Sequence, residues 1–457
     1  MWHSASRRST VRLPRNAAIS ELPQDDNMKT ITHRLPGLVL TGHEFTVPLD
    51  YGRPRSEQIV VFAREVVAPE KEEAGLPWLV FFAGGPGFPS PRPQACSGWL
   101  KRALQEYRVL LLDERGTGRS TPITHQTLAW RGAPQAQAEY VAHFRADNVV
   151  RDAELIRREL LGPDGKWSAL GQSFGGFCVA RYLSAAPDGL REAFITGGLP
   201  PLDRPVDDIY RATYRRLSAK NRLYFERYPD DDARAREIVD YLASHEVRLP
   251  GGGRLTPRRF QQLGIAFGMS DGFEPVHYLL EDAFVAGPAG RELSYTFLRA
   301  FEGRFAFDTN PIYFLLHEAE YCQGEASGWS AERVRAQFPE FELAPDRPVR
   351  FTGEMVYPWM AEEFEALRPL QACAEILAQK ADWPRLYDLD ALRANTVPTA
   401  AAVYLDDMYV ESAYSQETAS FIPNVRAWIT NEYEHNALRA DGERVLSRLV
   451  GMVRGES

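Results

Sequence analysis

The chain has 457 residues, more than one ordinary domain of roughly 100–200 residues, so we expect a core with a second domain or a large insertion. Apolar residues make up 44% and charged residues 25% of the chain, which is typical of a soluble globular protein and excludes a disordered or fibrous one. A net charge of −9 excludes a basic field for nucleic acid or anionic lipid, and no run of about 18 apolar residues predicts a membrane span.

Residues 1–27 are basic but lack the apolar run of about 7–15 residues that a signal peptide requires. We expect them to form an unstructured leader, and Met28, where strand-like composition begins, is an alternative start of translation. The four cysteines are widely spaced and form no CxxC pair, which predicts neither disulfides nor a thiolate metal site. This pattern favours the cytoplasm.

The first half of the chain alternates strand and helix patterns. Residues 45–49 and 58–63 are predicted to form antiparallel strands at one edge of a sheet. The continuous apolar runs at 78–83 and 108–113 are typical of parallel strands that helices cover on both faces. A helical pattern at 146–161 ends at a Gly-Pro-Asp-Gly turn, and a strand at 167–170 follows.

The second half interrupts this pattern and then resumes it. Residues 205–390 are rich in Arg, Glu and aromatics, with helical spacing at 209–228 and 233–242, which predicts a helical cap domain. Strands are predicted at 396–405 and 424–430, and a last helix runs through 445–450. The core is therefore expected to be discontinuous, comprising 28–204 and 391–457, with the cap inserted at 205–390.

A nucleophile motif stands between a predicted strand and a predicted helix at 177–185. Residues 171–175 read Gly-Gln-Ser-Phe-Gly, which matches G-x-S-x-G and places Ser173 on a sharp strand-to-helix turn. Glycines flank the serine because the strained turn has no room for side chains. The motif in this context predicts an α/β-hydrolase fold, a mostly parallel sheet flanked by helices, with Ser173 as nucleophile.

In this fold the acid and then the base follow the serine along the chain, on loops after late strands. Of the nine histidines, only His435 follows the resumed core strand, so it is the predicted base. Asp406 and Asp407 both follow the strand at 396–405, and position alone allows either one to orient the imidazole of His435.

An oxyanion hole requires two backbone N–H groups. One is expected from Phe174, directly after the nucleophile. The other is expected from Gly85, with Gly84 as the alternative, because Gly-Gly-Pro-Gly at 84–87 follows an early strand and lets the backbone approach a carbonyl oxygen.

These segments together resemble the proline iminopeptidases, in particular the longer bacterial members with an enlarged cap. The resemblance covers nearly everything from Met28 to the C-terminus, and its markers lie at 84–87, 113–120, 171–176, 405–410 and 431–435. Alignment with the Gly-Arg-Tyr-Asp segment of shorter members implies that Asp407 is the acid. One departure is Ala83, where shorter members have histidine, which alters the local hydrogen bonding but not the backbone donors.

The resemblance implies removal of an N-terminal proline, with cap carboxylates that bind its free imino nitrogen. A buried cationic amine needs a fixed counter-charge, and a peptide with a blocked N-terminus would leave that charge unpaired. Glu318 matches a family segment Glu-x-x-Tyr, and Glu354 is the expected second carboxylate. Tyr357 and Trp359 are candidate walls of an apolar proline slot, although ordinary packing explains them equally well.

We therefore predict acyl transfer to Ser173, with small peptides as substrates. His317-Glu318 does not continue as H-E-x-x-H, so no metal is predicted, and no cofactor is expected. The alternatives are an aminopeptidase of broader specificity or a carboxylesterase on the same scaffold, and a binding protein that keeps the fold without catalysis. The sequence carries no indication of oligomeric state.

Overall fold

The computed structural model describes residues 31–456 with the exception of 289 and 346. The predicted leader and the alternative start at Met28 lie outside the described residues. A twisted sheet of nine strands organises the fold, in the order β1-β2-β3-β5-β4-β6-β7-β12-β13. Its strands are β1 (Ile31–Leu35), β2 (Leu38–Pro48), β3 (Gln58–Val67), β4 (Trp78–Phe82), β5 (Arg108–Leu112), β6 (Trp167–Gln172), β7 (Leu190–Thr196), β12 (Thr399–Tyr404) and β13 (Val425–Thr430).

One edge of the sheet is antiparallel and the rest is parallel. Strands β1, β2, β3 and β5 pair antiparallel in sequence order. Strands β5, β4, β6, β7, β12 and β13 are all parallel neighbours. Because parallel strands share a direction, the loops after β6, β12 and β13 emerge at the same edge of the sheet.

Helices cover both faces of the sheet, which explains the continuous apolar runs. In β4, Val80 and Phe82 belong to one hydrophobic core, whereas Leu79 and Phe81 belong to the other. Helices α4 and α5 contribute to the first core, and α1 and α18 to the second. The core helices are α1 (Gly98–Ala103), α2 (His125–Ala129), α3 (Pro134–Val141), α4 (Ala146–Leu161), α5 (Phe174–Ala185), α16 (Ser412–Phe421), α17 (Ala437–Ala440) and α18 (Gly442–Arg454).

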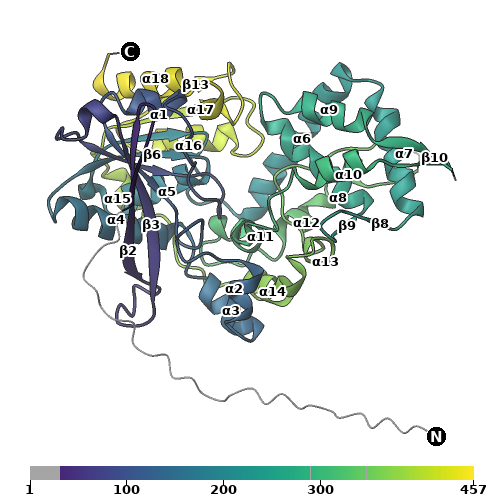
Figure 1. The fold of residues 1–457 in the computed structure, drawn as a ribbon, viewed down its shortest axis with the longest axis horizontal. Coiled ribbons are helices and arrows are strands. Elements are labelled where there is room, and N and C mark those ends of the chain that lie inside the picture. Colours follow the sequence, from purple (N-terminus) through teal and green to yellow (C-terminus); the bar gives the residue numbers. More distant parts are fainter. Residues whose placement is uncertain (1–30, 289, 346, 457) are drawn as a thin grey trace, which may run out of the picture.

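A long insertion separates β7 from β12. In Figure 1 most of it forms the lobe to the right of the sheet. Its helices are α6 (Val206–Arg227), α7 (Asp231–Ser244), α8 (Pro257–Gln261), α9 (Phe273–Glu281), α10 (Tyr295–Glu302), α11 (Pro311–Leu316), α12 (Ser330–Arg335), α13 (Met360–Glu363), α14 (Gln371–Gln379) and α15 (Leu389–Arg393).

The insertion also holds two small hairpins and several 3₁₀ helices. The hairpins pair β8 (Val247–Arg248) with β9 (Arg254–Leu255), and β10 (Phe284–Gly287) with β11 (Gly290–Leu293). The 3₁₀ helices η3 (Gln262–Gly268) and η4 (Glu318–Tyr321) lie near the site described below. Because α3 contacts α14 and α5 contacts α15, the insertion is attached to the core at several points. The domain limits at 205 and 390 stay a prediction.

Differences from the sequence predictions occur mainly at element ends. The helix expected at 177–185 begins three residues earlier, at Phe174, directly after Ser173. The strand expected from 396 begins at Thr399, because Pro398 has no N–H for the ladder. Strand β7 carried no prediction, whereas β1 lies just after Met28, where strand-like composition begins.

Candidate active site

Ser173 occupies the strained turn between β6 and α5. Its φ of 55° and ψ of −124° lie where residues other than glycine are rare. A Cβ on Gly175 would stand 2.1 Å from the carbonyl oxygen of Phe82, and one on Gly171 would stand 2.2 Å from that of Gly175. Both positions therefore require glycine. The surrounding backbone holds the serine in its strained conformation at the strand edge.

His435 and Asp407 form a hydrogen-bonded pair at the same edge. Asp407 follows β12 and His435 follows β13, and the imidazole Nδ1 lies 2.8 Å from Asp407 Oδ2. The other oxygen, Oδ1, accepts hydrogen bonds from the backbone N–H groups of Tyr409 at 2.8 Å and Val410 at 3.1 Å. Asp407 is thus fixed on both oxygens, and it leaves the imidazole Nε2 free to face a reacting group.

Asp406, the positional alternative, points away from this pair. Its side chain is 59% exposed and lies 3.7 Å from Arg216, whereas the side chain of Asp407 is 1% exposed. The geometry therefore places Asp407 beside the imidazole and leaves Asp406 in solvent.

The electrostatics of the pair favour a protonated imidazole during reaction. Burial lowers the pKa of His435 and is the largest single influence, but the charge and hydrogen bond of Asp407 together with the charges of Glu354 and Glu434 outweigh it, and the net shift of the pKa is upward. An imidazolium formed by proton transfer is thereby stabilised.

The loop that carries His435 is also attached to the insertion. The backbone N–H of His435 donates to the carbonyl of Gly268 at 3.1 Å. The next residue, Asn436, accepts from the Ser270 N–H at 3.0 Å and donates to Asp271 at 3.1 Å. The base is therefore held by the sheet on one side and by the segment at the end of η3 on the other.

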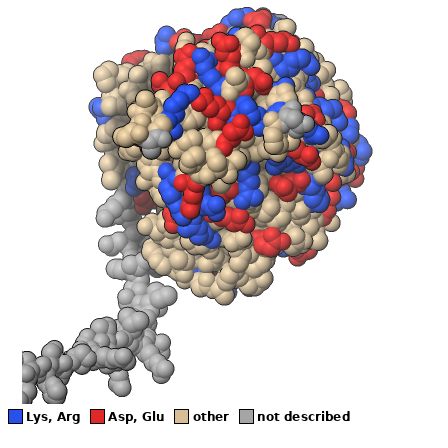
Figure 2. All heavy atoms as spheres, turned by 90° about the vertical axis from the view of Figure 1, so that its right-hand side faces the viewer, with Lys and Arg blue, Asp and Glu red and all other residues tan. Residues whose placement is uncertain are grey.

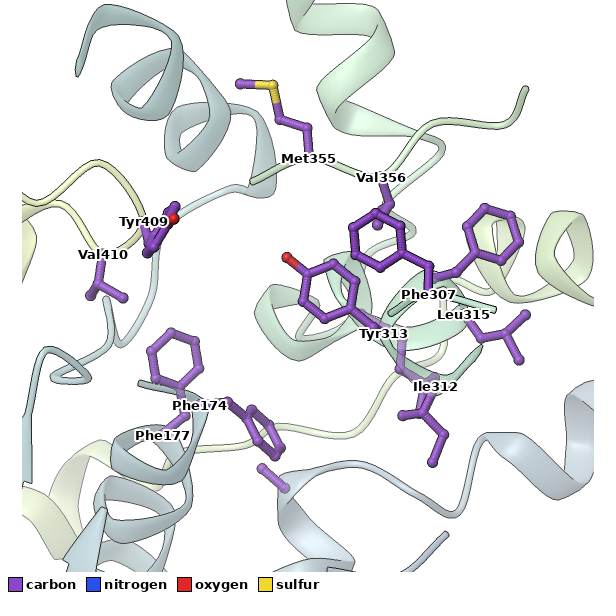
Figure 3. Close-up of a cluster of buried hydrophobic side chains, with 14 of the residues drawn as sticks. Phe174, Phe177, Phe307, Ile312, Tyr313, Leu315, Met355, Val356, Tyr409 and Val410 are labelled. Carbon is purple, nitrogen blue, oxygen red and sulfur yellow. The ribbon is translucent and has the colours of Figure 1, made fainter. Parts of the chain in front are cut away.

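A cavity of about 390 Å³ lies over Ser173 and between the two parts of the chain. Core residues on its wall include Gly84, Gly85 and His435, and the insertion contributes Phe307 and Tyr313, among others. Figure 3 shows Phe174, Phe177, Tyr409 and Val410 on one side of this region and Phe307 and Tyr313 on the other. The site is therefore lined mainly by apolar side chains, which come from both parts of the chain.

The glycine loop lies close to the nucleophile. A Cβ on Gly84 would stand 3.1 Å from Ser173 Cβ, so the backbone of this loop passes directly beside the serine. Gly85 lines the same cavity. Phe174, the other predicted oxyanion donor, begins α5, where the first backbone N–H groups have no partner within the helix.

Glu354 brings a carboxyl group into this apolar cavity. It accepts a hydrogen bond from the Tyr313 hydroxyl at 3.0 Å and lines the cavity together with Ser173 and His435. Burial raises the pKa of Glu354 to about 7, although the positive charge of His435 and the bond from Tyr313 oppose the rise. Such a carboxylate is poised to ionise fully when a cation binds beside it.

A narrow recess continues from Ser173 and holds a second carboxyl that the sequence analysis missed. Ser173, Glu354, Glu320 and Tyr321 all line it. Burial raises the pKa of Glu320 to about 8, while nearby Arg145 opposes the shift. Glu320 Oε1 has no hydrogen-bond partner among the described residues. Two buried carboxyls thus face one small space beside the nucleophile.

Glu318 does not reach this space, contrary to the expectation. Its two oxygens accept hydrogen bonds from the backbone N–H groups of Ser330 at 3.0 Å and Ala331 at 2.9 Å, at the start of α12. The structure therefore gives Glu318 a helix-capping role. Residues two apart on a tight helix such as η4 point in different directions, and the Glu-x-x-Tyr match could not reveal that the carboxyl in the recess is two residues further on.

Tyr357 also lies apart from the cavity. Its hydroxyl forms a 3.1 Å hydrogen bond with Tyr214, and its ring stacks on Trp359 at a centroid distance of 5.2 Å. Neither aromatic lines the cavity or the recess. The apolar wall that faces Ser173 comes instead from Phe307 and Tyr313, which stack at 5.0 Å.

The described part of the chain carries neither a metal-binding cluster nor a membrane-spanning helix. It contains no group of three His, Cys, Asp or Glu residues arranged to hold a metal ion. Within the same residues, no helix combines the length and apolar character needed to cross a membrane.

Several known proteins are similar to this sequence, two of them over most of its length. A family model described as the alpha/beta hydrolase fold matches residues 77–279. A proline iminopeptidase from Aeromonas sobria is 52% identical over 421 residues, which cover 92% of this chain and 98% of the relative. The proline iminopeptidase aneH of Aspergillus aculeatus is 36% identical over 429 residues, covering 92% and 95%. A tripeptidyl aminopeptidase from Streptomyces lividans is 26% identical over 202 residues, or 36% of each chain.

Proposed function

The chain belongs to the proline iminopeptidase family, and on that premise we propose that it is a serine exopeptidase that releases N-terminal proline from peptides. The α/β-hydrolase fold predicted from the sequence is confirmed. The observation that carries the proposal is the pair of buried carboxyls, Glu354 and Glu320, in one recess with Ser173.

The reacting groups would act in a fixed order. Ser173 Oγ attacks the carbonyl carbon of the N-terminal proline while His435 Nε2 takes the hydroxyl proton, and Asp407 holds the imidazolium. The backbone N–H groups of Phe174 and Gly85 donate to the oxyanion. His435 then gives its proton to the departing amine, and water repeats the sequence to release proline from the acyl-enzyme.

Recognition of the free amine would come from the recess. The protonated imino nitrogen of the substrate lies between Glu354 and Glu320, while the pyrrolidine ring stays in the larger cavity against Phe307 and Tyr313. A cation between these groups favours their ionised forms and repays their desolvation. An acylated N-terminus offers no such cation, so substrates with a blocked amine are disfavoured.

The same reasoning separates the alternatives. A carboxylesterase has no need of two buried carboxyls beside its nucleophile, because an ester acyl group carries no positive charge. An aminopeptidase of broader specificity would use the same carboxyls, but the stacked rings of Phe307 and Tyr313 offer an apolar wall that suits a compact cyclic residue.

The surface charge and the cysteines support a proposal about binding partners and cellular compartment. Acidic and basic side chains are intermixed over the face shown in Figure 2, so that face presents no single-sign patch for nucleic acid. Cys178, Cys322 and Cys373 are buried free thiols, and Cys96 is a free, partly exposed one. Unpaired thiols suit a reducing compartment, and we place the enzyme in the cytoplasm.

The decisive experiment compares prolyl-β-naphthylamide with its N-acetyl form, using the wild type and Ser173→Ala. We expect rapid hydrolysis of the free-amine substrate alone, and none by the variant. Equal turnover of both substrates, or turnover of simple esters only, would contradict the proposal and leave a general serine hydrolase.

A further inference from the structure

A second and larger cavity, of about 940 Å³, adjoins the active site on the side of His435. It shares Phe81, Pro91, Gln172, Met269 and His435 with the smaller cavity over the serine. Ser173 and the two recess carboxyls do not line it. The imidazole therefore stands between a space that reaches the carboxyls and a space that does not.

The recess and the large cavity also lie over opposite faces of the sheet, and the smaller cavity, which Phe81 also lines, lies between them. The recess is built on Phe174 and Phe177 of α5, which belong to the core shared with α4. The large cavity is built on Phe81, Leu100 and Leu438, which belong to the core shared with α1 and α18. A peptide that crosses the sheet edge at Ser173 would have its N-terminus over one face and its remainder over the other.

The chemistry of the reaction assigns the large cavity to the leaving peptide. His435 donates its proton to the departing amine, so the residue after the scissile bond must lie on the side of the imidazole. The N-terminal residue is directed to the other side by Glu354 and Glu320. Resting on the function proposed above, we propose that the 940 Å³ cavity binds the residues that follow the N-terminal proline.

The lining predicts which second residue is preferred. Trp99 is half-buried and stacks on Phe81 with a centroid distance of 4.6 Å and an angle of 28° between the rings, so part of its surface faces the cavity. An aromatic side chain packs well against such a platform. Trp99 is therefore the specificity-determining residue, and substrates with a large aromatic second residue are favoured.

The two arginines that line the large cavity are each paired with an aspartate. Arg92 makes two 2.6 Å hydrogen bonds to Asp113, and Arg439 bonds to Asp271 at 2.6 Å and 2.9 Å. Neither guanidinium is left without a carboxylate, so the cavity exerts little attraction on a free carboxylate at the substrate end. Selection at this cavity rests on apolar contact.

The test compares three substrates that differ only after the proline: prolinamide, Pro-Gly-NH₂ and Pro-Phe-NH₂. Prolinamide releases ammonia and places nothing in the large cavity. We expect wild-type kcat/KM, measured as proline release, to be at least about tenfold higher for Pro-Phe-NH₂ than for Pro-Gly-NH₂. Trp99→Ala should reduce this ratio to about threefold or less.

Two further variants keep the result interpretable. Trp130→Ala removes a tryptophan that is 82% exposed and lines neither cavity, and it should keep the wild-type ratio. Ala95→Trp fills the large cavity from an exposed loop, without disturbing the core, and should also lower the ratio.

Each outcome has a distinct meaning. Equal ratios in Trp99→Ala, Ala95→Trp and Trp130→Ala, or no phenylalanine preference in the wild type, would overturn the assignment of the cavity while prolinamide turnover still supports the proposed function. Wild-type failure on all three prolyl substrates would overturn the function and the assignment with it.

Discussion

The proposed catalytic residues and the proposed substrate-binding residues come from different parts of the molecule. Ser173, Asp407 and His435 stand at the ends of three parallel strands, where backbone topology fixes their positions. Glu354 and Glu320 lie in irregular or 3₁₀ segments of the insertion, where burial and single hydrogen bonds, from the Tyr313 hydroxyl and the Ala146 N–H respectively, hold them in place. The positions of the serine and the acid thus depend on the sheet, and that of the base depends on the sheet and on the end of η3. Substrate selection depends on how the insertion packs.

The largest effect should come from the acid at the strand edge. Asp407→Asn should lower kcat/KM for prolyl-β-naphthylamide by about 10³–10⁴-fold, because the amide no longer stabilises the imidazolium. Asp406→Asn is the matched control, since its side chain is 59% exposed, and it should stay within about threefold of wild type. A larger loss in Asp406→Asn than in Asp407→Asn would reverse the assignment.

A smaller effect should distinguish the carboxyls of the insertion from one another. Glu354→Gln and Glu320→Gln should each lower kcat/KM by about 10²-fold, because a buried cation loses one counter-charge. Glu318→Gln should change kcat/KM by less than about threefold but should lower the free energy of unfolding by about 1–2 kcal/mol, since α12 loses an acceptor. Steady-state kinetics and urea unfolding measure the two quantities separately. Strong loss of activity in Glu318→Gln with full stability would return it to the amine site.

The smallest effect concerns stability and pH. The pKa of Glu354 is raised to about 7 in the folded protein. Between about pH 4.5 and 7 this carboxyl is therefore ionised in the unfolded state but still protonated in the folded state. The free energy of unfolding therefore falls as the pH rises through this window, and the full loss is reached above pH 7. Glu354→Gln removes the cost and should raise the free energy of unfolding by on the order of 1–3 kcal/mol at pH 8, with little change at pH 4.5.

Urea unfolding of both proteins at pH 4.5 and pH 8 measures this difference. A gain of the same size at both pH values would show that the glutamine acts through packing and not through ionisation.

The site residues on the sheet could be predicted from the sequence, whereas those in the insertion could be predicted only in part. The strand patterns and the G-x-S-x-G turn were sufficient to locate Ser173, and chain order located His435, because the fold leaves few positions for these groups. Position alone allowed either Asp406 or Asp407 to be the acid, because the two residues differ only in the direction in which their side chains point. The Glu-x-x-Tyr match indicated Glu318 and gave no role to Glu320, for a related reason: sequence spacing does not tell which of two nearby carboxyls in a tight helix turns inward.

The hydrogen bonds between the His435 loop and the end of η3 have a mechanical consequence. An insertion that swung outward like a lid would pull on the same loop that aligns the base, so opening the enzyme would also switch it off. Hydrolysis then requires the arrangement in which these hydrogen bonds are formed. The attachment of the insertion and the alignment of the base are coupled, because one loop serves both.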